Sequence, residues 1–118
     1  MAHILVADDD GELVNLQRCL LEALGHEVET ALSTSGTMRQ LERRTPDLIV
    51  IDLRFPTAAE GMALIRGIRQ AGCRQPLIVL SGWPDDLQGA PEEQMVSRIV
   101  VKGSVRELLR TIAELLAA

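Results

Sequence analysis

The sequence predicts an α/β protein in which five parallel strands alternate with helices that lie on both faces of one sheet. Two observations support this fold class. Short apolar runs recur along the chain, and segments with helical periodicity separate them. Strict alternation of strand and helix is typical of a doubly wound open sheet with right-handed crossovers.

The five expected strands differ in their apolar patterns. Four are continuous apolar runs, which is typical of parallel strands covered by helices on both faces. The second alternates apolar and polar residues, and it is therefore expected at an edge of the sheet. In chain order the strands are expected over residues 4–7, 28–32, 48–51, 77–80 and 99–101.

Helical periodicity fills the spaces between and after these strands. Gly25 and Gly72 are placed to end the first and third helices, whereas Asp10 and Ser104 are placed to cap the first and last. Residues 83–96 contain two prolines and a glycine, so at most a short helix is expected there. The helices are expected over residues 13–24, 38–41, 62–68 and 105–116.

Length and composition indicate a single domain over residues 1–118. Hydrophobic residues make up 47% and charged residues 25%, which is enough to build a core without disulfide or metal staples. No apolar run approaches the length of a membrane span, and Cys19 and Cys73 lack the spacing of metal ligands. We therefore expect a cytoplasmic protein that does not contact a membrane.

Charge and aromatic content argue against nucleic-acid binding. The 12 Lys and Arg residues are outnumbered by 17 Asp and Glu residues, which leaves a net charge of −5. A surface that binds the phosphate backbone needs the opposite sign. Phe55 and Trp83 are the only aromatic residues, too few for a base-stacking surface. We expect no nucleic acid to bind through this chain.

Acidic residues directly follow two of the expected strands. The pattern allows two strand orders, and in the order 2-1-3-4-5 the first and third strands lie side by side. Asp8 and Asp9 after the first strand would then meet Asp52 after the third. Two unit charges about 4 Å apart repel by roughly 4 kcal/mol at an effective dielectric of about 20, so a positive group is required. Mg²⁺, which prefers oxygen ligands, meets that requirement.

Three further groups follow the remaining strands at the same edge. Lys102 supplies a second positive charge, Ser81 supplies a hydroxyl, and Gly82 leaves its backbone N–H open to an incoming anion. Combined with the carboxylates, these groups predict a site for metal-assisted phosphoryl transfer to Asp52. Trp83 is expected at the mouth of this site.

Four segments in this order resemble the bacterial response regulator receiver domain. They are ILVADDD at 4–10, PDLIVID at 46–52 with Pro56 beyond it, PLIVLSG at 76–82, and VVK at 100–102. The resemblance covers nearly the whole chain, and it implies a flavodoxin-like sheet of order 2-1-3-4-5.

The resemblance also implies a role for each site residue. Asp52 is the phosphoacceptor, and Lys102 and Ser81 take part in the transfer and bind the phosphoryl group together with the N–H of Gly82. Mg²⁺, or another divalent cation such as Mn²⁺, is held by carboxylates and a carbonyl. Its ligands would be Asp8, Asp9, Asp52 and the backbone carbonyl of Arg54.

By the same resemblance the chain is a switch of a two-component or phosphorelay system. The phosphoryl donor is a histidine kinase or a histidine phosphotransfer protein, or else a small acyl phosphate. Phosphorylation changes contacts with a downstream effector protein or domain. The chain is not expected to be an enzyme with a separate substrate, since it catalyses only its own phosphorylation and dephosphorylation.

Three departures from the family pattern carry expectations of their own. Gly103 replaces a proline after Lys102, so this peptide bond is expected to be trans or strained. Ile99 replaces a common aromatic switch residue, so coupling from Ser81 is expected to differ from the usual aromatic flip. One extra residue after Pro56 moves the helix glycine to Gly61 and changes the loop beside the site.

Two alternative functions remain open. A pseudo-receiver would keep the fold as an interaction module without phosphorylation, but retention of Asp8, Asp9, Asp52, Ser81 and Lys102 argues against it. A flavin or nucleotide enzyme of the same fold ranks last, because no glycine-rich phosphate loop follows the first strand and acids there would repel phosphates.

Overall fold

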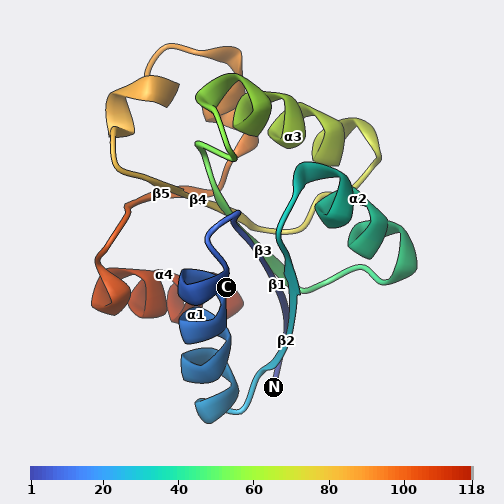
Figure 1. Cartoon of the computed structure of the whole chain (residues 1–118), viewed down its shortest axis with the longest axis vertical. Helices are drawn as coiled ribbons and strands as arrows, with labels where there is room; N and C mark the ends of the chain where they lie inside the picture. The colour runs from blue at the N-terminus through green and yellow to red at the C-terminus, as the bar shows by residue number, and fades with distance from the viewer. Residues whose placement is uncertain (118) are drawn as a thin grey trace.

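The computed structural model describes residues 1–117 and has one parallel sheet of five strands. The strand order β2-β1-β3-β4-β5 confirms the doubly wound class and selects the order 2-1-3-4-5 (Figure 1). β2 lies at one edge, as its alternating pattern predicted, and β5 lies at the other. The strands are β1 (His3–Ala7), β2 (Glu27–Ala31), β3 (Leu48–Asp52), β4 (Leu77–Ser81) and β5 (Arg98–Val101).

Helices cover both faces of the sheet, which is why the central strands are apolar throughout (Figure 1). Along β1, Ile4 and Val6 pack in the core under α1 and α4, whereas Leu5 and Ala7 pack in the core under α2 and α3. The helices are α1 (Gly11–Ala23), α2 (Thr34–Arg43), α3 (Ala58–Gln70) and α4 (Val105–Ala117). Within residues 1–117 no helix is both long and apolar enough to cross a membrane.

Side-chain caps set the start of two helices, as the sequence predicted. The carboxylate of Asp10 accepts hydrogen bonds from the N–H groups of Glu12 and Leu13 at 3.1 and 3.2 Å. The hydroxyl of Ser104 accepts one from the N–H of Glu107 at 3.3 Å. These two hydrogen bonds make Asp10 the cap of α1, so its carboxylate is engaged there, directly after Asp8 and Asp9 in the chain.

The segment between β4 and β5 holds two short 3₁₀-helices in place of a regular α-helix. Leu87 buries its side chain completely in the core under α3 and anchors the first of them. An ion pair of 2.7 Å between Arg66 of α3 and Glu92 holds the second. Their bounds are η1 (Pro84–Leu87) and η2 (Pro91–Met95).

Six predicted strand boundaries were wrong by one residue: β1 begins at His3 and β5 at Arg98, and the other four lie in β2, β3 and β4. Asp52 and Ser81 are the last residues of β3 and β4, since both still take part in the parallel ladder. β2 begins at Glu27, which pairs with His3, and it ends at Ala31. Leu32 therefore lies outside the strand and is 57% exposed.

Gly61 packs directly against the backbone that follows β3. A Cβ atom at this position would lie 1.6 Å from the carbonyl oxygen of Leu53, a distance that no side chain can occupy. The missing side chain thus lets α3 approach the loop that carries Arg54. This contact explains why position 61 requires a glycine.

Gly61→Ala should lower the free energy of unfolding by roughly 2–4 kcal/mol, because the helix and the loop must move apart. Gly67→Ala is the matched control in the same helix, where the nearest atom to a new Cβ is Met38 Sδ at 3.9 Å. The control should be neutral or stabilise by up to about 1 kcal/mol through helix propensity. Urea unfolding measures both, and equal stabilities would contradict the close packing.

Candidate functional site

Three carboxylates meet at the carboxyl ends of β1 and β3. Asp8 and Asp52 are 1% and 4% exposed, whereas Asp9 is exposed. One carboxylate oxygen from each lies within 4.8 Å of the other two. The parallel pairing of β1 with β3 brings these ends together, as the sequence predicted.

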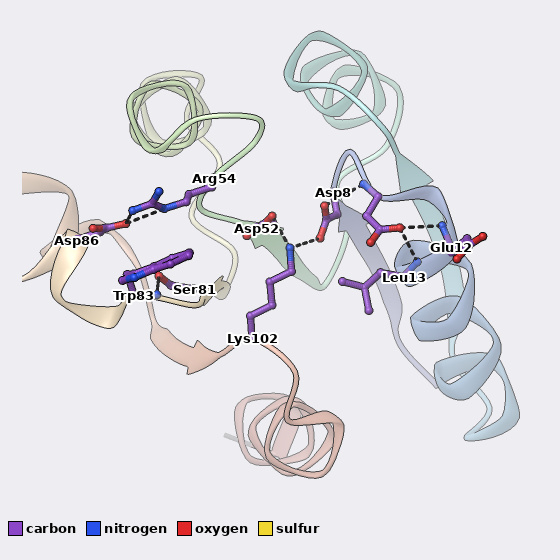
Figure 2. Close-up of polar contacts among 10 residues, drawn as sticks. Asp8, Glu12, Leu13, Asp52, Arg54, Ser81, Trp83, Asp86 and Lys102 are labelled. Atoms are coloured by element: carbon purple, nitrogen blue, oxygen red, sulfur yellow. Dashed lines mark hydrogen bonds and ion pairs between the residues drawn. The ribbon is translucent and has the colours of Figure 1, made fainter.

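Lys102 supplies the positive charge among these carboxylates (Figure 2). Its Nζ lies 2.7 Å from Oδ2 of Asp52 and 3.4 Å from Oδ2 of Asp8. Burial lowers the pKa of Lys102, but the hydrogen bond to Asp52 and the attraction of Asp8 outweigh it, so this pKa is raised. Lys102 therefore stays cationic and holds two acidic side chains at once.

The backbone after Lys102 differs from the family pattern without removing Lys102 from the site. The Lys102–Gly103 peptide bond is trans, which agrees with the prediction for a step without proline. Gly103 has a φ of 102°, in the left-handed region that favours glycine. Lys102 still reaches Asp52, and its N–H donates to the carbonyl of Ser81 at 2.9 Å.

Asp8 is the most perturbed of the acidic residues. Burial raises its pKa to about 6, and the negative charge of Asp52 adds to the shift, against a hydrogen bond from the N–H of Asp10 at 3.0 Å. The other oxygen, Oδ2, is buried and accepts no hydrogen bond. At 3.4 Å, Lys102 attracts this oxygen electrostatically without bonding to it.

These observations fit a hard divalent cation. The donor set consists of carboxylate oxygens, which Mg²⁺ and Mn²⁺ prefer, and Oδ2 of Asp8 lacks a hydrogen-bond donor. Asp8, Asp9 and Asp52 are the side chains that could hold the ion. The predicted fourth ligand is the backbone carbonyl of Arg54, whose side chain points away from the carboxylates toward Asp86 (Figure 2).

Ser81 and Gly82 lie at the same edge of the sheet. Asp52 is opposite Leu80 in the ladder, so Ser81 follows one position beyond it. The Ser81 hydroxyl is buried and accepts a hydrogen bond from the N–H of Trp83 at 3.0 Å. Apart from the adjacent residues, no atom of residues 1–117 lies within 4 Å of the position that a Cβ of Gly82 would take, so the backbone there faces open space.

One feature of the site was missed by the sequence analysis. The guanidinium of Arg54 lies 4.2 Å from the ring centroid of Trp83 and donates to Asp86. Trp83 itself is 61% exposed, at the mouth of the site as expected. Arg54 and Trp83 each stand two residues after a site residue on adjacent strands, and this spacing was the available signal.

Comparison with known proteins gives one family. The model of the response regulator receiver domain matches residues 4–114. The alkaline phosphatase synthesis transcriptional regulatory protein PhoP of Bacillus subtilis is 33% identical over 78 residues, which are 66% of this chain and 32% of that protein. The virulence transcriptional regulatory protein PhoP of Salmonella typhimurium is 30% identical over 91 residues, 75% of this chain and 40% of that protein. The chain thus spans well under half of these relatives.

Solved structures agree on the fold. Response regulator protein TrrA from Thermotoga maritima, in complex with Mg²⁺-BeF, has a TM-score of 0.85 at 23% identity, covering 98% of this chain and 99% of that one. A response regulator receiver domain protein from Clostridium thermocellum has a TM-score of 0.81 at 26% identity, covering 94% and 90%.

In EDTA, Asp8 should make stability fall as pH rises from about 4 to about 6. Its pKa is 3.8 in the unfolded chain and about 6 when folded, so the folded state binds the proton more tightly. Below pH 4 Asp8 does not reduce the free energy of unfolding, and above pH 6 it reduces this free energy by roughly 2–3 kcal/mol.

Asp8→Asn should remove this pH dependence and raise the free energy of unfolding above pH 6. Asp10→Asn is the control: asparagine still caps α1, so this variant should keep the wild-type pH dependence. Chemical denaturation across pH measures the effect. If Asp8→Asn kept the wild-type pH profile, the pH dependence would arise from a group other than Asp8.

Mg²⁺ at 100 times its dissociation constant should raise the free energy of unfolding of wild type by about 2.7 kcal/mol, which denaturation with Mg²⁺ and with EDTA would measure.

Proposed function

The chain belongs to the response regulator receiver domain family, and on that premise we propose that it is a phosphoacceptor switch of a two-component or phosphorelay system. Asp52 receives the phosphoryl group. The observation that carries this proposal is the position of Lys102, whose ammonium bridges Asp52 and Asp8 inside a cluster of three carboxylates.

The proposed reaction is an in-line displacement at phosphorus. The donor is the phosphohistidine of a histidine kinase or phosphotransfer protein, or a small acyl phosphate. Lys102 bonds Oδ2 of Asp52, which leaves Oδ1 as the attacking oxygen. A new O–P bond forms as the bond from phosphorus to the donor breaks. This is the P–N bond to the imidazole of a phosphohistidine, or the P–O bond to an acyl phosphate, which leaves as a carboxylate. Lys102, Ser81 and the N–H of Gly82 then bind the phosphoryl oxygens.

A divalent cation fits the acidic side of the site. When bound, it would offset the repulsion between Asp52 and the incoming phosphoryl group. Asp8, Asp9, Asp52 and the carbonyl of Arg54 would hold it. The structure of TrrA, a neighbour in fold, contains Mg²⁺-BeF, which supports the same choice of cation here.

The proposed output is a change of protein contacts and not the turnover of a separate substrate. The similar proteins are transcriptional regulators in which the matched region is under half of the length. We therefore propose a downstream effector protein or domain as the recipient of the signal. We also propose a cytoplasmic location, with no nucleic acid or membrane bound through this chain.

The labelling reaction tests the proposal against the pseudo-receiver alternative. With a small acyl phosphate and Mg²⁺, intact mass should increase by one phosphoryl group in wild type and not in Asp52→Asn. Asp85→Asn, a change at an exposed aspartate of η1, should be labelled like wild type. Absence of labelling in wild type would favour the pseudo-receiver, and equal labelling of Asp52→Asn would move the acceptor elsewhere.

Trp83 should report phosphorylation through its emission. The new phosphoryl group, with about −1.5 to −2 charges, should attract the Ser81 hydroxyl. Before phosphorylation this hydroxyl accepts a hydrogen bond from the backbone N–H of Trp83, so its movement should change the surroundings of Trp83. Mg²⁺ with beryllofluoride should therefore shift Trp83 emission in wild type and leave Asp52→Ala unchanged. The same shift in Asp52→Ala would mean that the signal arises outside this site.

A further inference from the structure

We propose that Arg54 is a second cationic ligand of the phosphoryl group, held away from Asp52 by Asp86 until phosphorylation occurs. The inference rests on the proposed function and extends it to a residue that the family resemblance used only for its backbone carbonyl. It assigns the guanidinium two alternative partners, one on η1 and one at the phosphorylation site.

The present contact of Arg54 is a weak one. Nε and one terminal nitrogen both donate to the same oxygen, Oδ2 of Asp86, at 3.2 and 3.1 Å. The side chains are 47% and 24% exposed. An exposed pair that uses one carboxylate oxygen lacks the paired geometry of a bidentate contact and contributes little to stability. Arg54 can therefore leave Asp86 at low cost, and the further contact that it gives up is that with the exposed ring of Trp83.

Arg54 is placed within reach of the phosphoryl group. It follows Asp52 by two residues, a span of about 7 Å at most. Figure 2 shows its side chain directed away from Asp52 toward η1, on the side of the site opposite Asp8. Rotation about its side-chain bonds would carry the guanidinium toward the acceptor from the side that Lys102 leaves open.

Charge favours the exchange once Asp52 carries a phosphoryl group. Asp86 offers one negative charge, whereas the phosphoryl group offers about −1.5 to −2 charges and three acceptor oxygens. A planar guanidinium can bond two of these oxygens at once. The same residue is thus held by Asp86 before transfer and by the phosphoryl group after it.

The exchange supplies a route for the signal to η1. The sequence has no tyrosine and Phe55 is buried, so Trp83 is the exposed aromatic side chain beside the site. Departure of Arg54 would free Asp86 and remove the cation that lies 4.2 Å from the Trp83 ring. Asp86 belongs to η1, so the release acts directly on that helix.

Binding of Mg²⁺ with beryllofluoride, measured by isothermal titration calorimetry, tests the exchange. Asp86→Asn frees Arg54 and should tighten binding by about three- to tenfold, while Arg54→Gln should weaken it by a similar factor. The double variant should bind like Arg54→Gln, since Asp86 acts only through Arg54. Arg66→Gln, which breaks the other ion pair of this segment, should match wild type.

The opposite signs of the two single variants distinguish exchange from a fixed structural contact. If Arg54 and Asp86 only hold η1 in place, both variants should change binding in the same direction, and this result would overturn the proposal. An unchanged affinity in Asp86→Asn would overturn it as well. Failure of wild type to bind beryllofluoride would instead count against the proposed function, so the two failures are separable.

Discussion

The site depends on the attraction between one ammonium group and two buried carboxylates. The fold places Asp8 and Asp52 at adjacent strand ends, where their repulsion works against folding, and Lys102 crosses the end of β4 to offset it. The offset is incomplete, because one oxygen of Asp8 remains without a hydrogen-bond donor. The folded chain can therefore bind a further cation at the carboxylates, and Lys102 can also bind an incoming anion.

The two sides of the site differ in how firmly they are held. On the α3 side, Gly61 brings the helix backbone against the carbonyl of Leu53, so the loop after Asp52 has little freedom. On the η1 side, a buried leucine and an exposed ion pair hold a short 3₁₀-helix. Movement after phosphorylation is therefore expected in η1 and less in α3.

The apolar runs predicted all five strands, because β1, β3 and β4 are buried throughout and the edge strands β2 and β5 are still partly buried. The residues at the strand ends then indicated Asp8, Asp9, Asp52, Ser81 and Lys102 as the candidate site. The end of β2 was misplaced, since Leu32 is apolar but lies beyond the paired residues. The contact of Arg54 with Asp86 could not be predicted, because it joins the loop after β3 to η1, whose position depends on how Leu87 packs. Local sequence determines strands and caps, whereas contacts between loops follow from tertiary packing.

Burial on both faces has a consequence for the register of β1. In a strand with one polar face, a slip by one residue would expose apolar side chains and bury polar ones. Ile4 to Ala7 are apolar at every position, so such a slip would leave both cores filled with aliphatic residues. The polar residues at the strand ends therefore favour the observed alignment, since a shifted β1 would separate Asp8 from Lys102. The charges that form the site thus also contribute to the register of the sheet.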